Sequence, residues 1–186
     1  MTVRAPVLHT EQLWLDLPVL SDRYAVAGYC ADPLFETLMT LPWPYEQRHA
    51  DFFLFRVVPG GWLSGEELTW AIRESEGGPL LGIIGWRRGM SDIGFWLGAP
   101  HRGRGLMTEA VLAITDWLAV ELGVTEIAWE CVRGNAASAA VARKCGFTFT
   151  GERATQLTFR DGSHPPAWHG RFRVGDTREE KPGWPV

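Results

Sequence analysis

Apolar residues alternate with polar ones over residues 12–17, and this repeat of two predicts a first strand. After this strand, apolar positions recur at helical spacing between residues that start or stop helices. The spacing predicts three helices, over 21–31, near 33–40 and over 45–57. Pro59, Gly60 and Gly61 are expected to end the third helix, because proline and glycine interrupt helical hydrogen bonding.

Between residues 68 and 97 the pattern changes to that of strands. Short apolar runs are separated by turns rich in glycine and serine at 75–78 and 89–91. The runs predict strands over 68–73, 80–88 and 93–97. Short connections between consecutive strands favour antiparallel pairing, so a three-stranded meander is expected.

The rest of the chain combines both patterns. Apolar residues at helical spacing from Leu106 to Leu122 predict one long helix, which Gly123 ends. Asn135 is a suitable cap for a short helix that runs to Lys144. Strands are predicted over 125–132, 147–159 and 168–174. Together the elements indicate the α/β (α+β) class, with a twisted, mixed and mostly antiparallel sheet of about seven strands flanked by helices.

Length and composition limit the number of domains and the kinds of partner. The 186 residues are 46% hydrophobic and 22% charged, as in one ordinary globular domain. We expect this domain over residues 1–175 and a polar C-terminal tail over 176–186. The net charge of −4 gives no general attraction to nucleic acid or to anionic membranes. No signal peptide or membrane span is expected, so a cytoplasmic location is predicted, and a homodimer stays open.

The cysteines at positions 30, 131 and 145 are odd in number and widely spaced. They form no Cys-x-x-Cys pair and have no histidine cluster at metal-ligand spacing nearby. Buried, reduced thiols are therefore expected, and no metal is expected to bind.

The segment His101–Ala110 holds the strongest chemical signal. It joins a predicted strand to the long helix, and in it Gly103 and Gly105 alternate with Arg102 and Arg104. The first amides of a helix have no partner within the helix, and the helix dipole places partial positive charge there. Glycine lets a phosphate approach these amides, and arginine adds full charge. The segment therefore predicts phosphate binding.

Two common phosphate motifs fit this segment poorly. A P-loop ends in Gly-Lys-Ser/Thr, whereas Leu106 and Met107 follow Gly105 here. A dinucleotide-binding fold would have a third glycine in place of Thr108 and a parallel sheet of βαβ units. The predicted antiparallel meander disagrees with such a sheet.

A second segment, Asn135–Phe147, narrows the ligand. It is a capped helix with an apolar side, closed by a Gly-Phe pair. Together the two segments resemble those of the GNAT family of acetyl-CoA-dependent N-acetyltransferases. The family's Arg/Gln-x-x-Gly-x-Gly/Ala signature falls at Arg102, Gly105 and Met107, and the form with methionine is similar to that of the RimJ/RimL branch. The resemblance extends over residues 8–162.

The resemblance implies a GNAT domain in which two adjacent parallel strands, the fourth and fifth of the sheet, diverge. Here these are the strands that end near Leu97 and Val132. Acetyl-CoA would enter between them, and the amides of residues 103–108 would bind its pyrophosphate. The implied cofactor-binding residues are Trp96, Leu97, Arg102, Gly103, Arg104, Gly105, Leu106, Met107, Thr108, Asn135 and Ser138.

The catalytic residues are less clear. Ala142 stands where many family members have a tyrosine that protonates the leaving thiolate, so the resemblance implies Ser138 as the proton donor. Leu157 falls where RimL has a glutamate base, which leaves the base unassigned. Glu130 or His169 could be the base, directly or through water, since attack on a thioester needs an uncharged amine. Alternatively, Ser138 bonds only to its own helix backbone, and Glu130 is a solvent-facing strand carboxylate.

The acceptor amine is the least determined part. Trp43 and Trp62 lie outside the regular patterns and are expected to line the acceptor site. An α-amine has a reference pKa of about 7.7–8.0 and is partly neutral at cellular pH, which suits a site without an obvious strong base. We therefore predict transfer of acetyl to a primary amine, first of all a protein or peptide N-terminus. Acetylation of a small molecule such as an antibiotic, a polyamine or a metabolite stays open, as does a non-catalytic acyl-CoA-binding module.

Overall fold

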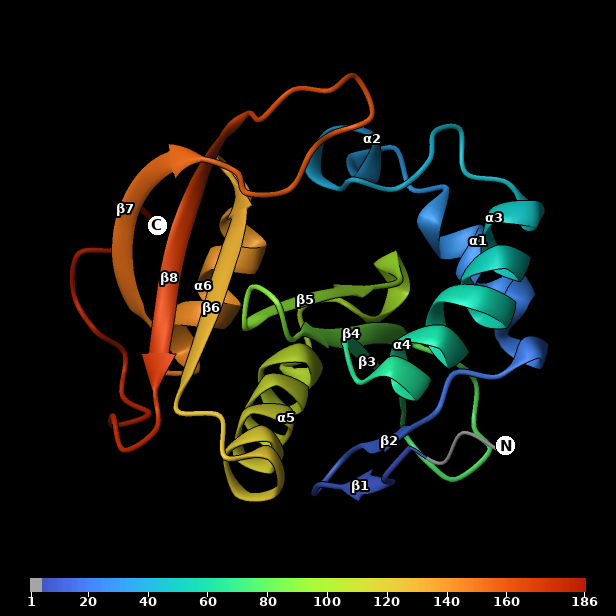
Figure 1. Ribbon diagram of the computed structural model, residues 1–186, viewed down its shortest axis with the longest axis horizontal. Coiled ribbons are helices and arrows are strands. Elements are labelled where there is room, and N and C mark those ends of the chain that lie inside the picture. Colours follow the sequence, from blue (N-terminus) through green and yellow to red (C-terminus); the bar gives the residue numbers. More distant parts are fainter. Residues whose placement is uncertain (1–4) are drawn as a thin grey trace.

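The computed structural model describes residues 5–186, so residues 1–4 of the expected domain lie outside the described residues. Eight strands form one sheet in the order β1-β2-β3-β4-β5-β6-β8-β7 (Figure 1). No helix of the described residues is long and apolar enough to cross a membrane. The strands are β1 Leu8–His9, β2 Trp14–Asp16, β3 Glu67–Arg73, β4 Gly82–Arg87, β5 Asp92–Leu97, β6 Glu126–Val132, β7 Thr148–Ala154 and β8 Pro166–Arg173.

The middle of the sheet is the predicted meander. β3, β4 and β5 pair antiparallel, so that Glu67 lies opposite Arg87, and Arg87 opposite Asp92. β2 pairs with the outer edge of β3, and β1 pairs with β2. The sheet has one strand more than expected, because Leu8 and His9 form a short edge strand.

β5 and β6 run parallel and are joined at a single residue pair, Asp92 with Ala128. Beyond this pair the two strands diverge, as their different directions in Figure 1 show. On its other side, β6 pairs along its whole length with β8, which also pairs with β7. The expected divergence of two adjacent parallel strands is therefore confirmed.

Helices cover both faces of the sheet. α5 and α6 bury their apolar sides against one face, where α5 residues such as Ile114 share a core with Trp70 and Ile84 of the meander. The N-terminal helices form a second core on the other face with Ile83 and Trp96. The helical segments are η1 Leu20–Asp22, α1 Arg23–Cys30, α2 Leu34–Leu38, α3 Gln47–Phe52, η2 Phe53–Val57, α4 Val58–Ser64, η3 Ala99–His101, α5 Leu106–Leu122 and α6 Ala136–Lys144.

The prediction that Pro59, Gly60 and Gly61 end a helix is wrong. α3 continues through the π-helical turn η2 into α4, which contains all three residues. Pro59 is tolerated because it lies in the first turn of α4, directly after the wider hydrogen bonding of the π-helical turn. Gly61 is required by close packing, since a Cβ there would lie 2.2 Å from the carbonyl oxygen of Glu67.

The predicted strand over 147–159 is too long, because β7 ends at Ala154. The next amides bond elsewhere: the Thr155 N–H donates to the Pro165 carbonyl, and the Gln156 N–H donates to the Glu130 carboxylate. Residues 155–165 therefore form a loop, which extends from the β7–β8 end of the sheet towards α2 in Figure 1.

Residues 176–186, expected to be a polar tail, pack onto the sheet and α6. The ring centroid of Trp184 lies 5.5 Å from those of Trp129 and Phe149. The guanidinium of Arg178 lies 3.8 Å from the ring centroid of Phe172. The aromatic and cationic residues of this segment thus contribute to the core of the domain.

Candidate active site

The divergence of β5 and β6 opens a cavity of about 730 Å³, which is within the usual size range of small-molecule sites. One end lies between the first residues of α5 and one side of α6. The other end, which we call the distal chamber, is lined by α2, η2, the loop 155–165 and the first residues of β3. Ten of the expected cofactor-binding residues line the cavity: Trp96, Leu97, Arg102, Gly103, Gly105, Leu106, Met107, Thr108, Asn135 and Ser138.

The glycine turn before α5 presents unpaired amides to the cavity. Gly103 and Gly105 have φ values of +76° and +80°, which glycine adopts readily. A Cβ on either glycine would meet nothing within 4 Å, so the space in front of the turn is open. Within residues 5–186, the backbone N–H groups of residues 103–108 donate to no backbone carbonyl outside regular elements. The next N–H along the chain, that of Glu109, donates to the Gly105 carbonyl at 3.1 Å. This geometry fits an anion such as the pyrophosphate of coenzyme A.

The two arginines of the turn are already paired with carboxylates of the protein. Arg102 Nη2 lies 2.7 Å from Asp32 Oδ2, and its Nε donates to the Leu97 carbonyl at 3.0 Å. Arg104 pairs with Glu74 and is not among the residues that line the cavity. The expectation that both side chains add free positive charge is therefore corrected: both guanidinium groups are paired with carboxylates, and the unpaired groups of the turn are its backbone amides.

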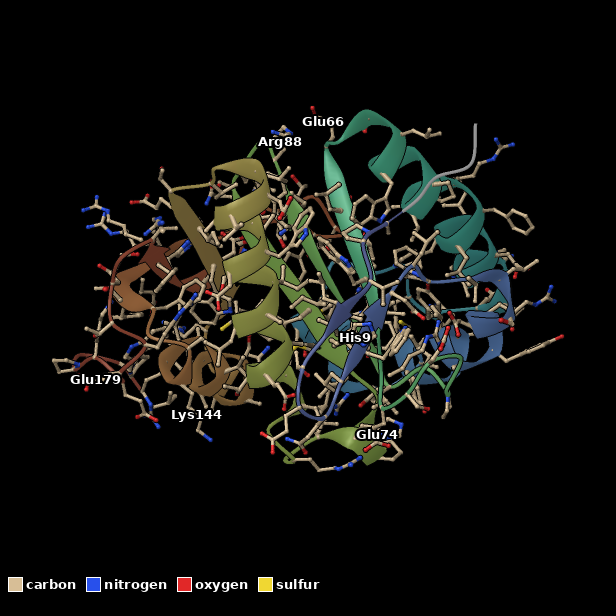
Figure 2. The ribbon with its side chains drawn as sticks, turned by 90° about the horizontal axis from the view of Figure 1, so that it is seen from below. His9, Glu66, Glu74, Arg88, Lys144 and Glu179 are labelled. Carbon is tan, nitrogen blue, oxygen red and sulfur yellow. The ribbon has the colours of Figure 1, made fainter. Side chains whose placement is uncertain are left out.

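Lys144, which the sequence reasoning missed, brings an unpaired cation to the cavity. It is the last residue of α6, it is exposed, and it lines the cavity. No carboxylate of the described residues forms an ion pair with it. In Figure 2, Lys144 and Glu74, the partner of Arg104, lie along the same edge of the molecule. A basic residue in the last turn of a helix is ordinarily explained by the helix dipole, so its position in the sequence gave no separate signal.

Asn135 and Ser138 lie where α6 begins, beside the end of β6. The Asn135 side chain accepts the Ser138 N–H at 3.3 Å, which confirms the predicted cap. The Ser138 hydroxyl oxygen accepts the indole N–H of Trp129 at 3.2 Å. This bond uses a lone pair of the oxygen and leaves the hydroxyl proton for another acceptor, and the Cys131 thiol is one neighbour within its reach.

Glu130 also lines the cavity, but its carboxylate is occupied. The side chain is only 6% exposed. It accepts the hydroxyl of Thr155 and the backbone N–H groups of Gln156 at 3.0 Å and Leu157 at 3.3 Å. The alternative of a solvent-facing carboxylate is therefore wrong. Glu130 therefore holds the start of the loop 155–165, and the hydrogen bonds that it accepts within the described residues all come from this loop.

His169 lies behind Glu130, as its partner across β6 and β8. The imidazole is 1% exposed, and its Nδ1 lies 3.4 Å from Glu130 Oε2. Desolvation lowers the pKa of His169, and the charge of Arg153 acts in the same direction. His169 is not among the residues that line the cavity, so its expected role as a base in direct contact with the amine is not supported.

Acid is expected to destabilise the protein through His169. Its pKa in the folded protein is below the ordinary value, so the unfolded chain binds a proton more readily as pH falls. The stability from the neutral, buried imidazole is complete above about pH 6.5 and is lost as pH falls from there through the folded pKa. Thermal unfolding between about pH 7.5 and 5 measures this loss. The His169→Gln variant should show a shallower decline, and an equal decline in both proteins would contradict the assignment.

Trp43 and Trp62 are not among the residues that line the cavity, contrary to the expectation for an acceptor site. Trp62 packs edge-on against Trp70, with ring centroids 4.9 Å apart, and its indole N–H donates to the Thr69 carbonyl at 3.0 Å. Trp43 is half-buried in the segment between α2 and α3. Trp62 is thus used for packing, which a sequence pattern cannot distinguish from ligand contact.

The cysteines are free and buried, as expected. Burial raises the pKa of Cys30, Cys131 and Cys145 to about 12 in each case. Cys131, which lines the cavity, is therefore a neutral thiol near pH 7 and a poor nucleophile. Within the described part of the chain, no group of three or more His, Cys, Asp or Glu residues could hold a metal ion.

Comparisons with known proteins agree with this geometry. A family model described as an acetyltransferase (GNAT) domain matches residues 12–148. No curated protein matches the chain at significant sequence similarity.

Three solved structures share the fold. The ribosomal-protein-S5-alanine acetyltransferase from Vibrio fischeri is 17% identical, with a TM-score of 0.75 over 96% of this chain and 100% of that one. RimL, a ribosomal L7/L12 α-N-protein acetyltransferase in complex with coenzyme A, is 17% identical, with a TM-score of 0.77 over 91% and 98%. The microcin C7 self-immunity acetyltransferase MccE, in complex with acetyl-CoA and AMP, is 18% identical, with a TM-score of 0.76 over 89% and 94%. Because the family model matches most of its length, this chain belongs to the GNAT acetyltransferase family.

Proposed function

We propose that this protein transfers acetyl from acetyl-CoA to the α-amine of a protein or peptide N-terminus. The observation that carries the proposal is one continuous cavity, which connects the unpaired amides before α5 with the distal chamber through the gap between β5 and β6. Two of the similar structures are named as acetyltransferases of ribosomal proteins, and these names support this kind of acceptor.

The donor would occupy the part of the cavity nearest α5. The amides of residues 103–108 would hold the pyrophosphate, and Lys144 would add a charge at the edge. Beyond Asp92 and Ala128, the facing edges of β5 and β6 are not paired with each other. Their backbone groups are therefore available to the amides of the pantetheine arm.

The reaction needs few groups from the protein. The amine nitrogen attacks the thioester carbonyl carbon, a C–N bond forms and the C–S bond breaks. Ser138 gives its hydroxyl proton to the departing thiolate and regains one from the acetylated nitrogen. Direct attack is favoured over an acetyl-enzyme because the cavity's Cys131 is protonated near pH 7. An α-amine of pKa about 7.7–8.0 needs little help from a base, which agrees with the occupied carboxylate of Glu130.

A thioester-release assay tests the function. The donor is acetyl-CoA, and the acceptors are peptides of varied first residue, the same peptides with a blocked α-amine, and small amines. We expect release of coenzyme A only with free α-amines, and one added acetyl group by mass spectrometry. Binding of acetyl-CoA with no acetylation of any amine would support a non-catalytic binding module instead.

Lys144→Ala is expected to weaken acetyl-CoA binding roughly five- to tenfold, because an unpaired cation at the edge of the site makes a charge-assisted contact with phosphate. Arg104→Ala is the matched control. Its guanidinium is paired with Glu74, so we expect about a twofold change or less. Isothermal titration with acetyl-CoA measures both, and a larger effect of the Arg104 change would contradict the placement of the phosphates.

A small amine is a second candidate acceptor, favoured by the contacts of Arg160. Its guanidinium donates to the Leu41 carbonyl at 2.9 Å and to the Glu36 carbonyl. These bonds join the loop 155–165 to α2 and the segment after it, and the loop extends towards α2 in Figure 1. Residues of both segments line the distal chamber. A chamber bounded in this way admits a small amine or a flexible chain end, and the acceptor panel separates the two.

A further inference from the structure

We propose that the distal chamber selects primary amines that carry a bulky apolar group next to the amine, such as a peptide with a large apolar first residue. The inference rests on the proposed function, because it assigns the amine to the end of the cavity opposite the phosphate turn. Three features of the chamber carry it: an open floor, an unpaired buried hydroxyl beside a free carboxylate, and apolar walls.

The floor of the chamber has room because two central residues lack side chains. Thr69, Gly85 and Gly94 lie side by side on β3, β4 and β5 and share one face of the sheet. A Cβ on Gly94 would have its nearest neighbour at 3.8 Å, and one on Gly85 at 3.4 Å. All three residues line the cavity. Larger residues on β4 and β5 would fill the space that the acceptor needs.

Thr69 supplies a polar atom without a partner. The residue is only 2% exposed, and its hydroxyl oxygen makes no hydrogen bond with any described residue. A buried hydroxyl without a partner destabilises a protein unless another group satisfies it. Because Thr69 lines the chamber, a bound acceptor with a hydrogen-bonding group is the natural partner.

The charge beside Thr69 is negative. Glu67 lies two residues before it on the same face of β3, is half-buried and lines the chamber. The neighbouring cation, Arg87, forms two hydrogen bonds with Asp92. The Glu67 carboxylate therefore forms no ion pair with Arg87 or with any other described residue. A carboxylate and a hydroxyl on one floor favour an arriving ammonium group, which gives one proton to water before its nitrogen attacks.

The walls are apolar. They combine half-buried side chains from α2 and the segment after it, from η2 and from the loop 155–165. These segments are far apart in the sequence, and Arg160 joins the first to the last. An apolar group placed between these walls removes their surface from water, which a small or charged group does not do. The apolar side chains are Leu38, Met39, Leu41, Phe53, Leu157 and Phe159.

The first test compares peptides that differ only in their first residue, namely Phe, Leu, Ser or Asp, together with phenethylamine and ethanolamine as small amines. We expect kcat/KM for Phe and Leu to exceed that for Ser by about tenfold and that for Asp by more. Phenethylamine should exceed ethanolamine in the same direction if small amines also enter. Equal rates for Phe, Ser and Asp peptides would overturn the inference and leave the acetyltransferase activity standing. Absence of acetylation with every amine would instead contradict the proposed function.

The second test separates the polar and apolar parts of the chamber. Thr69→Val keeps the shape and removes the unpaired hydroxyl, so the melting temperature should not fall while the acceptor KM rises about tenfold. Phe159→Ser should lower kcat/KM for the Phe peptide about tenfold, a larger factor than for the Ser peptide. Phe55→Ser is the matched control, because Phe55 is 59% exposed and is not among the residues that line the cavity. An equal effect of the Phe55 and Phe159 changes, or a Thr69 variant with wild-type KM, would contradict the chamber.

Discussion

Gly105→Val is expected to weaken acetyl-CoA binding by about 100-fold or more, because charge-assisted hydrogen bonds to several amides are lost together. Gly105 is the residue before α5, with φ at +80° and open space where a Cβ would stand. A valine there would place two methyl groups in the open space beside the turn, where the phosphate is proposed to bind. It would also strain the backbone, since a β-branched residue avoids positive φ.

Gly123→Val is the control that separates these two effects. Gly123 ends the same helix with φ at +63°, and a Cβ there also meets nothing within 4 Å. Both variants should therefore lower the melting temperature by a similar amount, and only the Gly105 change should abolish acetyl-CoA binding. Isothermal titration and thermal unfolding of both proteins give the comparison. Wild-type affinity in the Gly105 variant would remove the turn from the cofactor site.

Ser138→Ala is expected to lower kcat about 100-fold with little change in acetyl-CoA affinity, because a positioned proton donor contributes at this order and acts only as the thiolate leaves. The geometry supports this role, since the hydroxyl accepts the Trp129 indole N–H and keeps its own proton for another acceptor. Steady-state kinetics with the best acceptor measure the change. The residue would be excluded as proton donor if the alanine variant kept wild-type kcat.

Ser138→Thr is the matched variant for this prediction. It keeps a hydroxyl at the same position of α6, so most of the rate should remain. Alanine also removes the acceptor of the Trp129 N–H, so thermal unfolding must accompany the kinetics. Loss of rate in alanine but not in threonine, at similar melting temperatures, would assign the effect to the proton.

The sequence by itself determined the elements whose signals are local. The Asn135 cap is formed by a bond to a residue three positions away, and the turn is formed by backbone conformations that Gly103 and Gly105 adopt readily, so both motifs predict their local geometry. The meander of β3, β4 and β5 was predicted for the same reason, because short turns set the pairing. These elements were sufficient to name the family and the donor.

Tertiary structure decided what the charged and aromatic residues do. Arg104 is neutralised by Glu74 from another strand end, and Glu130 is occupied by the loop after β7. Trp62 packs in the core, and Lys144 lies at the cavity. Each of these outcomes joins residues that are far apart in the chain, and no local pattern contains the partner.

The distal chamber shows most clearly which features depend on tertiary structure rather than on local sequence. Thr69, Gly85 and Phe159 belong to three separate elements, and none carries a motif. Their common cavity exists only because the meander aligns the first two and the loop 155–165 brings the third towards α2. Local backbone conformation therefore fixes the amides proposed to bind the donor, whereas the packing of distant segments shapes the chamber proposed for the amine.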